Sequence, residues 1–331
     1  MMYKMIADNV VNAMRGVLTT EQVTLLRGVL NKELAQVTIN ERPESTEQNI
    51  VANRKLKERF IAAKKIEGCS AKTLNYYEKT ISHYLDDTTT AIALQTTDDV
   101  RDYLVHYQET SRAGKVTIDN VRRILSSFFA WLEDEDYIAR SPVRRIHRVK
   151  TDTLVKDVIA DEQLEQLRDA CTCPRDIALV DFLASTGVRV GELVLLNRDD
   201  IDFNERQCIV YGKGGKERLV YFNARAKLHL KNYLDGRTDD NPALFVSANA
   251  PHGRLTINGV ERLVRRLGLS LHMPKVHPHK FRRTLATAAI DKGMPIEQVQ
   301  RLLGHVRIET TLRYAIVNQN NVKMAHRKYI G

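Results

Sequence analysis

The sequence predicts a mainly α-helical protein with a small antiparallel β-sheet in its second half. Helical spacing of apolar residues runs through residues 50–138, and a strand–turn–strand pattern, "QCIVYGKGGKERLVYF", occupies residues 207–222. Further helical segments flank this hairpin. A length of 331 residues suggests two or three domains, and 43% hydrophobic with 28% charged residues is an ordinary globular mix.

Residues 1–48 are expected to form a separate helical extension. Apolar residues recur at helical spacing over residues 1–38, and "TTEQ" resembles a capping box with Thr19 or Thr20 as the N-cap. A polar stretch with Pro43 follows and indicates a linker. We therefore expect two short helices, which serve either as a protein–protein contact or as a solvated extension.

Residues 49–140 are expected to form a bundle of four helices. The first helix is predicted to stop at Gly68, the second to begin after the N-cap Ser70, and the third to begin with a cap at Thr97. The fourth helix presents one apolar side, which indicates a shared core. The residues on that side are Ile118, Val121, Leu125, Phe128, Phe129 and Leu132.

The segment 141–154 is basic, carries Pro142 and lacks periodicity, so it is expected to be an interdomain linker that can lie against a polyanion. Residues 155–331 are expected to form the second large domain, which combines the β-hairpin with several helices. The stretch "ALFVS", residues 243–247, is a candidate short strand.

The charge of the chain favours a polyanionic partner. Lys and Arg number 51 against 41 Asp and Glu, a net charge of +10. Residues 1–48 carry 5 basic and 6 acidic residues, whereas residues 151–331 carry 28 and 21, so the excess belongs to the later segments. Nucleic acid is the simplest such partner.

The same composition indicates a cytoplasmic protein without a cofactor. The four cysteines show no disulfide framework, and Cys171 and Cys173 are interpreted as small helix-end residues rather than half of a metal site. No apolar run reaches the length of a membrane span, and the N-terminus lacks a signal-peptide core.

Two stretches of the sequence place positively charged side chains where an anion could bind. In "TGVRVGEL", Arg189 follows an apolar helix, and a half-buried arginine requires an anion, either Glu192 or Asp181 or a phosphate oxygen. In the hairpin turn, Lys213 and Lys216 stand among glycines that allow another backbone to approach closely. The spacing of this turn is not that of a Walker loop.

Two later stretches add histidines and a tyrosine. In "HPHKFRRT", His279 and Arg282 are three residues apart and share one face of a helix whose free N–H groups favour anions. A metal site at His277 and His279 is not favoured, because no further ligand lies at convincing spacing. In "LLGHVRIETTLRYA", His305 alone suggests a helix C-cap and Tyr314 alone a core tyrosine.

Taken together, these side chains suit the chemistry of one reaction at a phosphodiester. Arginine forks can clamp the non-bridging oxygens, and histidines can add hydrogen bonds. A tyrosine can attack phosphorus when nearby cations favour its phenolate, and a lysine can protonate the leaving 5′ oxygen. No metal is required, because the guanidinium groups supply the positive charge.

The chain resembles the tyrosine recombinases of the phage integrase and Xer type over roughly residues 50 to 320. The resemblance implies that Tyr314 is the nucleophile and that Lys213, rather than Lys216, is the catalytic lysine. The remaining catalytic residues that it implies are Arg189, His279, Arg282 and His305, with Glu192 in support.

The resemblance also implies a helical core-binding domain and a mixed catalytic domain that form a C-shaped clamp around duplex DNA. Tyr314 would form a 3′-phosphotyrosyl bond, and strand exchange would pass through a Holliday junction without metal or ATP. A dimer on each site and a tetramer in the synapse are implied, with the C-terminal tail exchanged between subunits. Integration, excision and inversion of a DNA segment are all compatible with this expectation.

Further basic residues are candidate DNA contacts, with base readout expected from helices near 114–130 and 256–268. These candidates are Lys115, Arg122, Arg123, Arg144, Arg145, Arg148, Lys216, Arg262, Arg265 and Arg283. The competing interpretations are a type IB topoisomerase-like or resolvase activity, and a DNA-binding regulator with an unused site.

Overall fold

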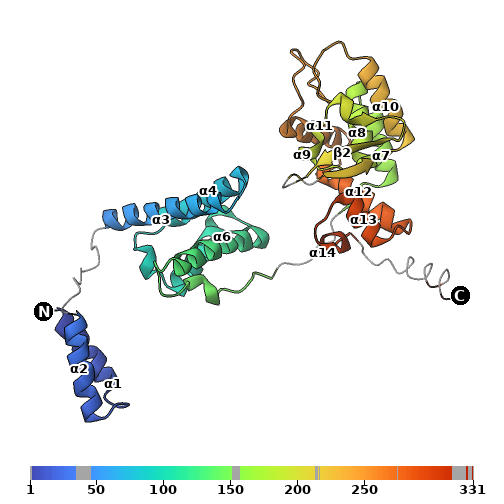
Figure 1. Cartoon of the computed structure of the whole chain (residues 1–331). Helices are drawn as coiled ribbons and strands as arrows, with labels where there is room; N and C mark the ends of the chain where they lie inside the picture. The colour runs from blue at the N-terminus through green and yellow to red at the C-terminus, as the bar shows by residue number, and fades with distance from the viewer. Residues whose placement is uncertain are drawn as a thin grey trace. The chain divides into compact units, whose positions relative to one another are not determined.

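The structure, a computed structural model, describes residues 2–34, 46–150, 157–212, 215, 217–273, 275–314, 326 and 330, with the backbone alone for residues 2–6. The chain forms two compact units, Met1–Thr153 and Leu154–Gly331. As predicted, helices dominate both units, and the described β-sheet belongs to the second (Figure 1). In the described part of the chain, no helix has the length and apolar character needed to cross a membrane.

The two helices expected at the N-terminus, α1 (Met2–Met14) and α2 (Thr20–Leu34), are present and pack against each other (Figure 1). The capping box belongs to Thr19, because its N–H donates to Gln22 Oε1 at 2.9 Å and its Oγ1 accepts from the Gln22 N–H at 3.4 Å. No residue of α2 is fully buried, and Leu25 is 70% exposed.

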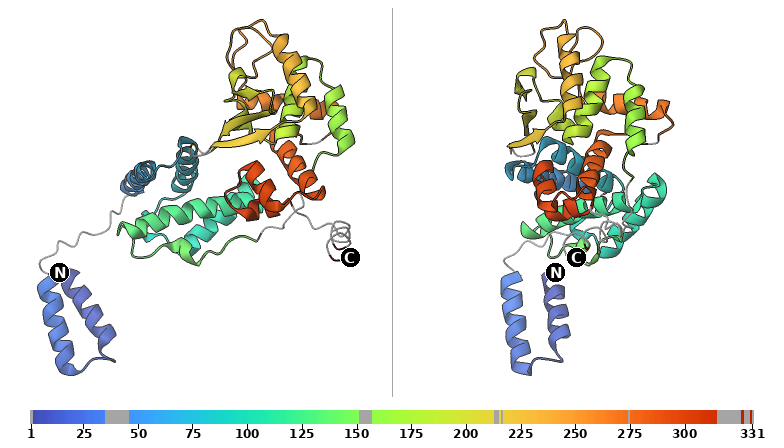
Figure 2. Two further views of the ribbon diagram at one scale, coloured as in Figure 1. Left: turned by 45° about the vertical axis from the view of Figure 1, so that its right-hand side comes forward. Right: turned by 90° about the vertical axis from the view of Figure 1, so that its right-hand side faces the viewer.

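Four helices form the predicted bundle (Figure 2). They are α3 (Thr46–Ile66), α4 (Ala71–Asp86), α5 (Thr97–Ser111) and α6 (Lys115–Asp134). All six residues of the predicted apolar side of α6 are buried, and Phe60 of α3 meets Phe128 and Trp131 edge-on with ring centroids 5.2 and 5.7 Å away.

Two of the three predicted helix boundaries in this bundle are confirmed. Gly68 adopts a φ of +85° after α3, and Ser70 Oγ accepts from the Thr73 N–H at 3.2 Å. The prediction for the third helix was wrong by one residue. Thr96 is the N-cap of α5, because its hydroxyl accepts from the Asp99 N–H and its own N–H donates to the Asp99 carboxylate.

Part of the segment expected to be a linker packs against the bundle. A short 3₁₀ helix, η2 (Pro142–Arg145), buries Pro142 and Val143. The Ser141 N–H donates to Glu133 Oε2 at 3.0 Å, and Thr97 Oγ1 donates to the Pro142 carbonyl at 2.9 Å. The first residues of this segment are therefore part of the bundle's surface.

The second unit packs helices around α8 (Pro174–Thr186), whose residues from Ala178 to Leu183 are all buried. Figure 1 shows α12, α13 and α14 together at one end of this unit. The other helices are α7 (Asp161–Asp169), α9 (Val190–Leu193), α10 (Ala224–Asp235), α11 (Ile257–Ser270), α12 (Pro278–Asp291), α13 (Ile296–Leu303) and α14 (Ile308–Leu312), together with the 3₁₀ helices η1 (Ile92–Leu94) of the first unit and η3 (Arg198–Asp200) of the second.

The sheet has three antiparallel strands in the order β1 (Ile201–Asp202), β2 (Gln207–Tyr211) and β3 (Glu217–Tyr221). The predicted hairpin is β2–β3. Residues 243–247 do not form the predicted strand, because their ladder contacts are two isolated bridges, Asn197 to Ala243 and Val246 to Arg254.

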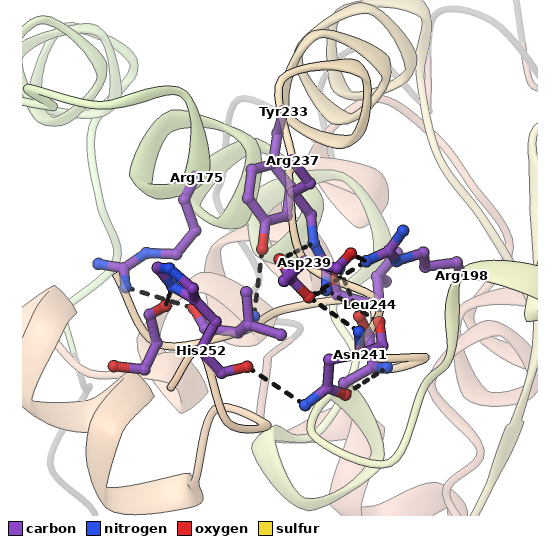
Figure 3. Close-up of polar contacts among 11 residues, drawn as sticks. Arg175, Arg198, Tyr233, Arg237, Asp239, Asn241, Leu244 and His252 are labelled. Carbon is purple, nitrogen blue, oxygen red and sulfur yellow. Dashed lines mark hydrogen bonds and ion pairs between the residues drawn. The ribbon is translucent and has the colours of Figure 1, made fainter. Parts of the chain in front are cut away.

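The loop between α10 and α11 is held by a buried arginine (Figure 3). Arg237 has a side chain only 3% exposed, and its guanidinium donates to both carboxylate oxygens of Asp239 and to three backbone carbonyls. Arg237 and a backbone hydrogen bond from Asn241 hold the pKa of Asp239 below its usual range, against the opposing effect of burial. One planar fork of donors therefore satisfies five acceptors of this loop.

We predict that Arg237→Lys lowers the free energy of unfolding by about 2–4 kcal/mol, because an ammonium cannot satisfy these acceptors in one plane. Urea unfolding of the full chain measures this loss. Arg225→Lys is the matched control, since Arg225 is 49% exposed and pairs with exposed Glu165, and its effect should stay within about 0.5 kcal/mol. Equal losses in both variants would contradict the role of Arg237.

Candidate active site

The first arginine of the site is positioned by a tight turn after α8. Gly187 ends that helix with a φ of +60°, and a Cβ there would lie 2.8 Å from Leu285 Cδ2. Arg189 then precedes α9, and its Nη1 donates to Glu192 Oε1 at 2.7 Å. Of the two carboxylates considered as its partner, Glu192 is therefore the one that Arg189 contacts. The alternative, Asp181, instead pairs with Arg168 at 2.6 Å.

Arg218 of β3, which was not among the predicted site residues, joins this pair. Its Nη2 donates to Glu192 Oε2 at 2.7 Å and its Nε to the Leu302 carbonyl at 3.3 Å. The side chain is 11% exposed. A signal was available, because Arg218 lies two residues before buried Val220 and so shares its inward face of the strand. A charged residue on that face requires a partner.

Glu192 is a buried carboxylate held between two arginines. Burial by itself would raise the pKa of its carboxyl group, but hydrogen bonds from Arg218 and Arg189 outweigh burial and lower it. Glu192 is therefore ionised at neutral pH, and it orients both guanidinium groups.

Arg282 of α12 is the most deeply buried of the three arginines, at 1% exposure. Its Nη1 donates to the Gly187 carbonyl at 2.7 Å, and its Nη2 donates to the Leu303 carbonyl. Burial, together with the charges of Arg189 and Arg218, lowers the pKa of Arg282 to about 9, which still leaves it charged at neutral pH. Three guanidinium groups thus share one carboxylate, Glu192, and the excess positive charge favours an anion.

His305 lies beside these arginines at the end of α13. Gly304 ends that helix with a φ of +63°, and a Cβ there would lie 2.6 Å from Arg218 Cδ. Burial and the charges of Arg282, Arg189, His279 and Arg218 lower the pKa of His305 to about 4. The imidazole is therefore neutral at neutral pH and offers a single N–H donor.

Tyr314 lies in a hydrophobic cluster and also contacts His305. It is 9% exposed and packs with Ala286, Val299 and Leu303, as a core tyrosine does. Its ring also lies beside that of His305, with centroids 5.9 Å apart and an angle of 28° between the planes.

A cavity of about 500 Å³ reaches two arginines of this cluster. Arg189, His279 and Arg282 line it, and the candidate DNA contact Arg265 lies on its wall. The rings of His279 and His277 are nearly parallel, with centroids 6.4 Å apart. The structure therefore brings together every predicted catalytic residue that it describes. Lys213 and Lys216 fall outside the described residues, and in the sequence they lie between β2 and β3.

The nine candidate DNA contacts that the structure describes divide into two groups. Two of them are engaged inside the protein: Arg122 is 13% exposed and bound to Asp119 at 2.9 Å, and Arg283 is 9% exposed and donates to the Asp157 carbonyl at 2.8 Å. These contacts do not favour a role in DNA binding. The exposed candidates are Lys115, Arg123, Arg144, Arg145, Arg148, Arg262 and Arg265.

Comparison with known proteins shows which family the chain resembles over both of its units. Residues 157–321 match the phage integrase family, and residues 56–139 match the N-terminal SAM-like domain of phage integrases. The chain is 34% identical to tyrosine recombinase XerC of Oceanobacillus iheyensis over 291 residues, 81% of this chain and 93% of that one. It is 31% identical to tyrosine recombinase XerD of Ralstonia nicotianae over 280 residues, 80% and 89% of the two chains.

Solved structures share the fold at lower identity. The Tn1549 transposon integrase in complex with a circular intermediate DNA matches with a TM-score of 0.72 and 19% identity, over 84% of this chain and 99% of that one. The XerH site-specific recombinase bound to palindromic difH substrate matches with a TM-score of 0.65 and 18% identity, over 99% and 96%. The chain therefore belongs to the phage integrase family and is a tyrosine recombinase, an enzyme that breaks and rejoins DNA.

Proposed function

We propose that this enzyme performs site-specific recombination through a 3′-phosphotyrosyl bond formed by Tyr314. The observation that carries the proposal is the cluster in which Arg189, Arg282 and His305 lie around a net positive site beside a tyrosine. A phosphodiester is the anion whose chemistry uses all of these groups.

Arg189 and Arg282 neutralise the non-bridging oxygens of the scissile phosphate. The two groups are held by Glu192 and by backbone carbonyls, so they need little reorganisation when charge develops in the transition state. His305 is neutral and donates its N–H to the same phosphate, as does His279 from the wall of the cavity.

The covalent step exchanges one ester bond for another. The Tyr314 oxygen forms a bond to phosphorus while its proton passes to water, and the bond from phosphorus to the 5′ oxygen breaks. Lys213 gives a proton to that oxygen, which leaves as a hydroxyl. The hydroxyl of a partner strand reverses the step, so the bond energy is kept in the protein–DNA ester and no ATP is consumed.

The assembly follows from this exchange. Two duplexes with paired inverted-repeat sites require a dimer on each site and a tetramer in the Holliday-junction intermediate. Residues 49–140 and residues 155–331 both contact the DNA, and the C-terminal tail is exchanged between subunits. Residues 1–48 provide a protein contact that supports synapsis. A topoisomerase-like activity would instead relax supercoils without exchange of partner strands.

The nucleophile is tested with Tyr314→Phe. The variant should bind DNA with unchanged affinity but form no covalent complex, because phenylalanine lacks the attacking oxygen. The substrate is a plasmid that carries the inverted repeats beside the gene, and the complex is detected by denaturing electrophoresis and peptide mass spectrometry. A covalent complex formed by the variant would contradict the assignment, and an unused regulatory site would give none even with the wild-type chain.

The role of Lys213 is tested with a change of leaving group. Lys213→Ala should slow cleavage of ordinary DNA about 10²- to 10⁴-fold, the usual contribution of a general acid. A substrate with sulfur in place of the 5′ bridging oxygen should restore the rate, since a thiolate leaves without a proton. Lys216→Ala is the matched control from the same turn and should need no rescue. Absence of rescue for Lys213→Ala would contradict the proton-donor role.

A further inference from the structure

Thr311 contacts the buried side of His305. The Nδ1 atom of His305 lies 2.9 Å from Thr311 Oγ1, and Thr311 is fully buried on α14. The Thr311 carbonyl also accepts from the Tyr314 N–H at 2.9 Å. One residue thus contacts both the histidine ring and the backbone of the tyrosine.

The direction of the hydrogen bond between these side chains decides what His305 can do. A neutral imidazole carries one N–H, and the nitrogen that bears it is set by the partner of the other nitrogen. If the Thr311 hydroxyl donates to Nδ1, the proton of the ring is on Nε2, which can donate to an anion. If Nδ1 donates to the hydroxyl, Nε2 presents a lone pair that an anion repels.

We propose that Thr311 is a positioning residue whose hydroxyl donates to His305 Nδ1 and so keeps the N–H on Nε2, directed at the scissile phosphate. This inference rests on the function proposed above and assigns a residue that neither the motif nor the sequence analysis singled out. It also links the two groups in space, because a shift of Thr311 moves the imidazole and Tyr314 together.

Packing alone does not account for a threonine at this position. A fully buried hydroxyl costs free energy unless it is hydrogen-bonded, and valine would fill the same volume with an apolar methyl group. A structural role would therefore be served as well by valine, whereas control of the tautomer requires the hydroxyl.

The test compares Thr311→Val, which keeps the shape, with Thr311→Ser, which keeps the hydroxyl. In full-length protein bound to DNA with Tyr314→Phe in the background, ¹⁵N–¹H correlation spectra of labelled histidine report which nitrogen of His305 bears the proton, with His305→Gln providing the assignment. The parent and the serine variant should show the Nε2–H form. The valine variant should show a mixture or the Nδ1–H form.

The second measurement is the rate of DNA cleavage by Thr311 variants that retain Tyr314. Thr311→Val should cleave about 10- to 100-fold more slowly with unchanged DNA affinity, and Thr311→Ser should stay within about threefold of the parent. An unchanged tautomer and rate in the valine variant would overturn the inference, as would equal losses for serine and valine. If the unaltered enzyme forms no covalent complex, the proposed function is wrong. The tautomer measurement would then still test the role of Thr311, because it does not depend on cleavage.

Discussion

Three guanidinium groups held around one buried carboxylate are the constraint on which the second unit depends. Glu192 binds Arg189 and Arg218 directly, while Arg282 lies buried beside them. Like charges at this density repel one another, and burial removes the water that would screen them. The folded chain therefore keeps an excess of positive charge at one point, and this excess favours an anion.

Backbone carbonyls at the ends of two helices stabilise the buried arginines. Arg282 donates to the carbonyls of Gly187 and Leu303, and Arg218 donates to that of Leu302. These carbonyls belong to the last turns of α8 and α13, where unpaired C=O groups carry partial negative charge. Each arginine thus satisfies a helix end while it is oriented for an anion. Stability of the fold and preparation of the site come from the same contacts.

Most of the helical framework could be predicted from sequence because long amphipathic helices repeat their pattern several times. The apolar side of α6 and the cap at Ser70 are examples. Helices as short as α9 and α14 show no period. Residues 243–247 have the composition of a strand, but residues 243–246 are buried in a loop that makes only isolated bridges. Local pattern does not distinguish these cases, because tertiary contacts decide them.

The candidate site was predictable to the extent that it lies in recognisable motifs. Arg189, Arg282 and His305 came from such stretches, and their closeness in space required the fold. Arg218 was not predicted, because the sequence interpretation of this hairpin rested on the glycines and lysines of its turn. The two-residue spacing of Arg218 and buried Val220 nevertheless places both side chains on the inward face of the strand. Thr311 carries no signal in the sequence, since only the ring nitrogen beside it gives its hydroxyl a role. The placement of Lys213 stays a prediction.

The central claim is that the arginine cluster exists to neutralise a phosphate, and removal of that phosphate's charge tests it most directly. Arg189 is 43% exposed, so Arg189→Ala should fold. With a methylphosphonate at the scissile position, which lacks the negative charge, this variant should regain cleavage that it loses on ordinary DNA. An equal defect on both substrates would contradict the account, because the guanidinium group would then serve something other than charge.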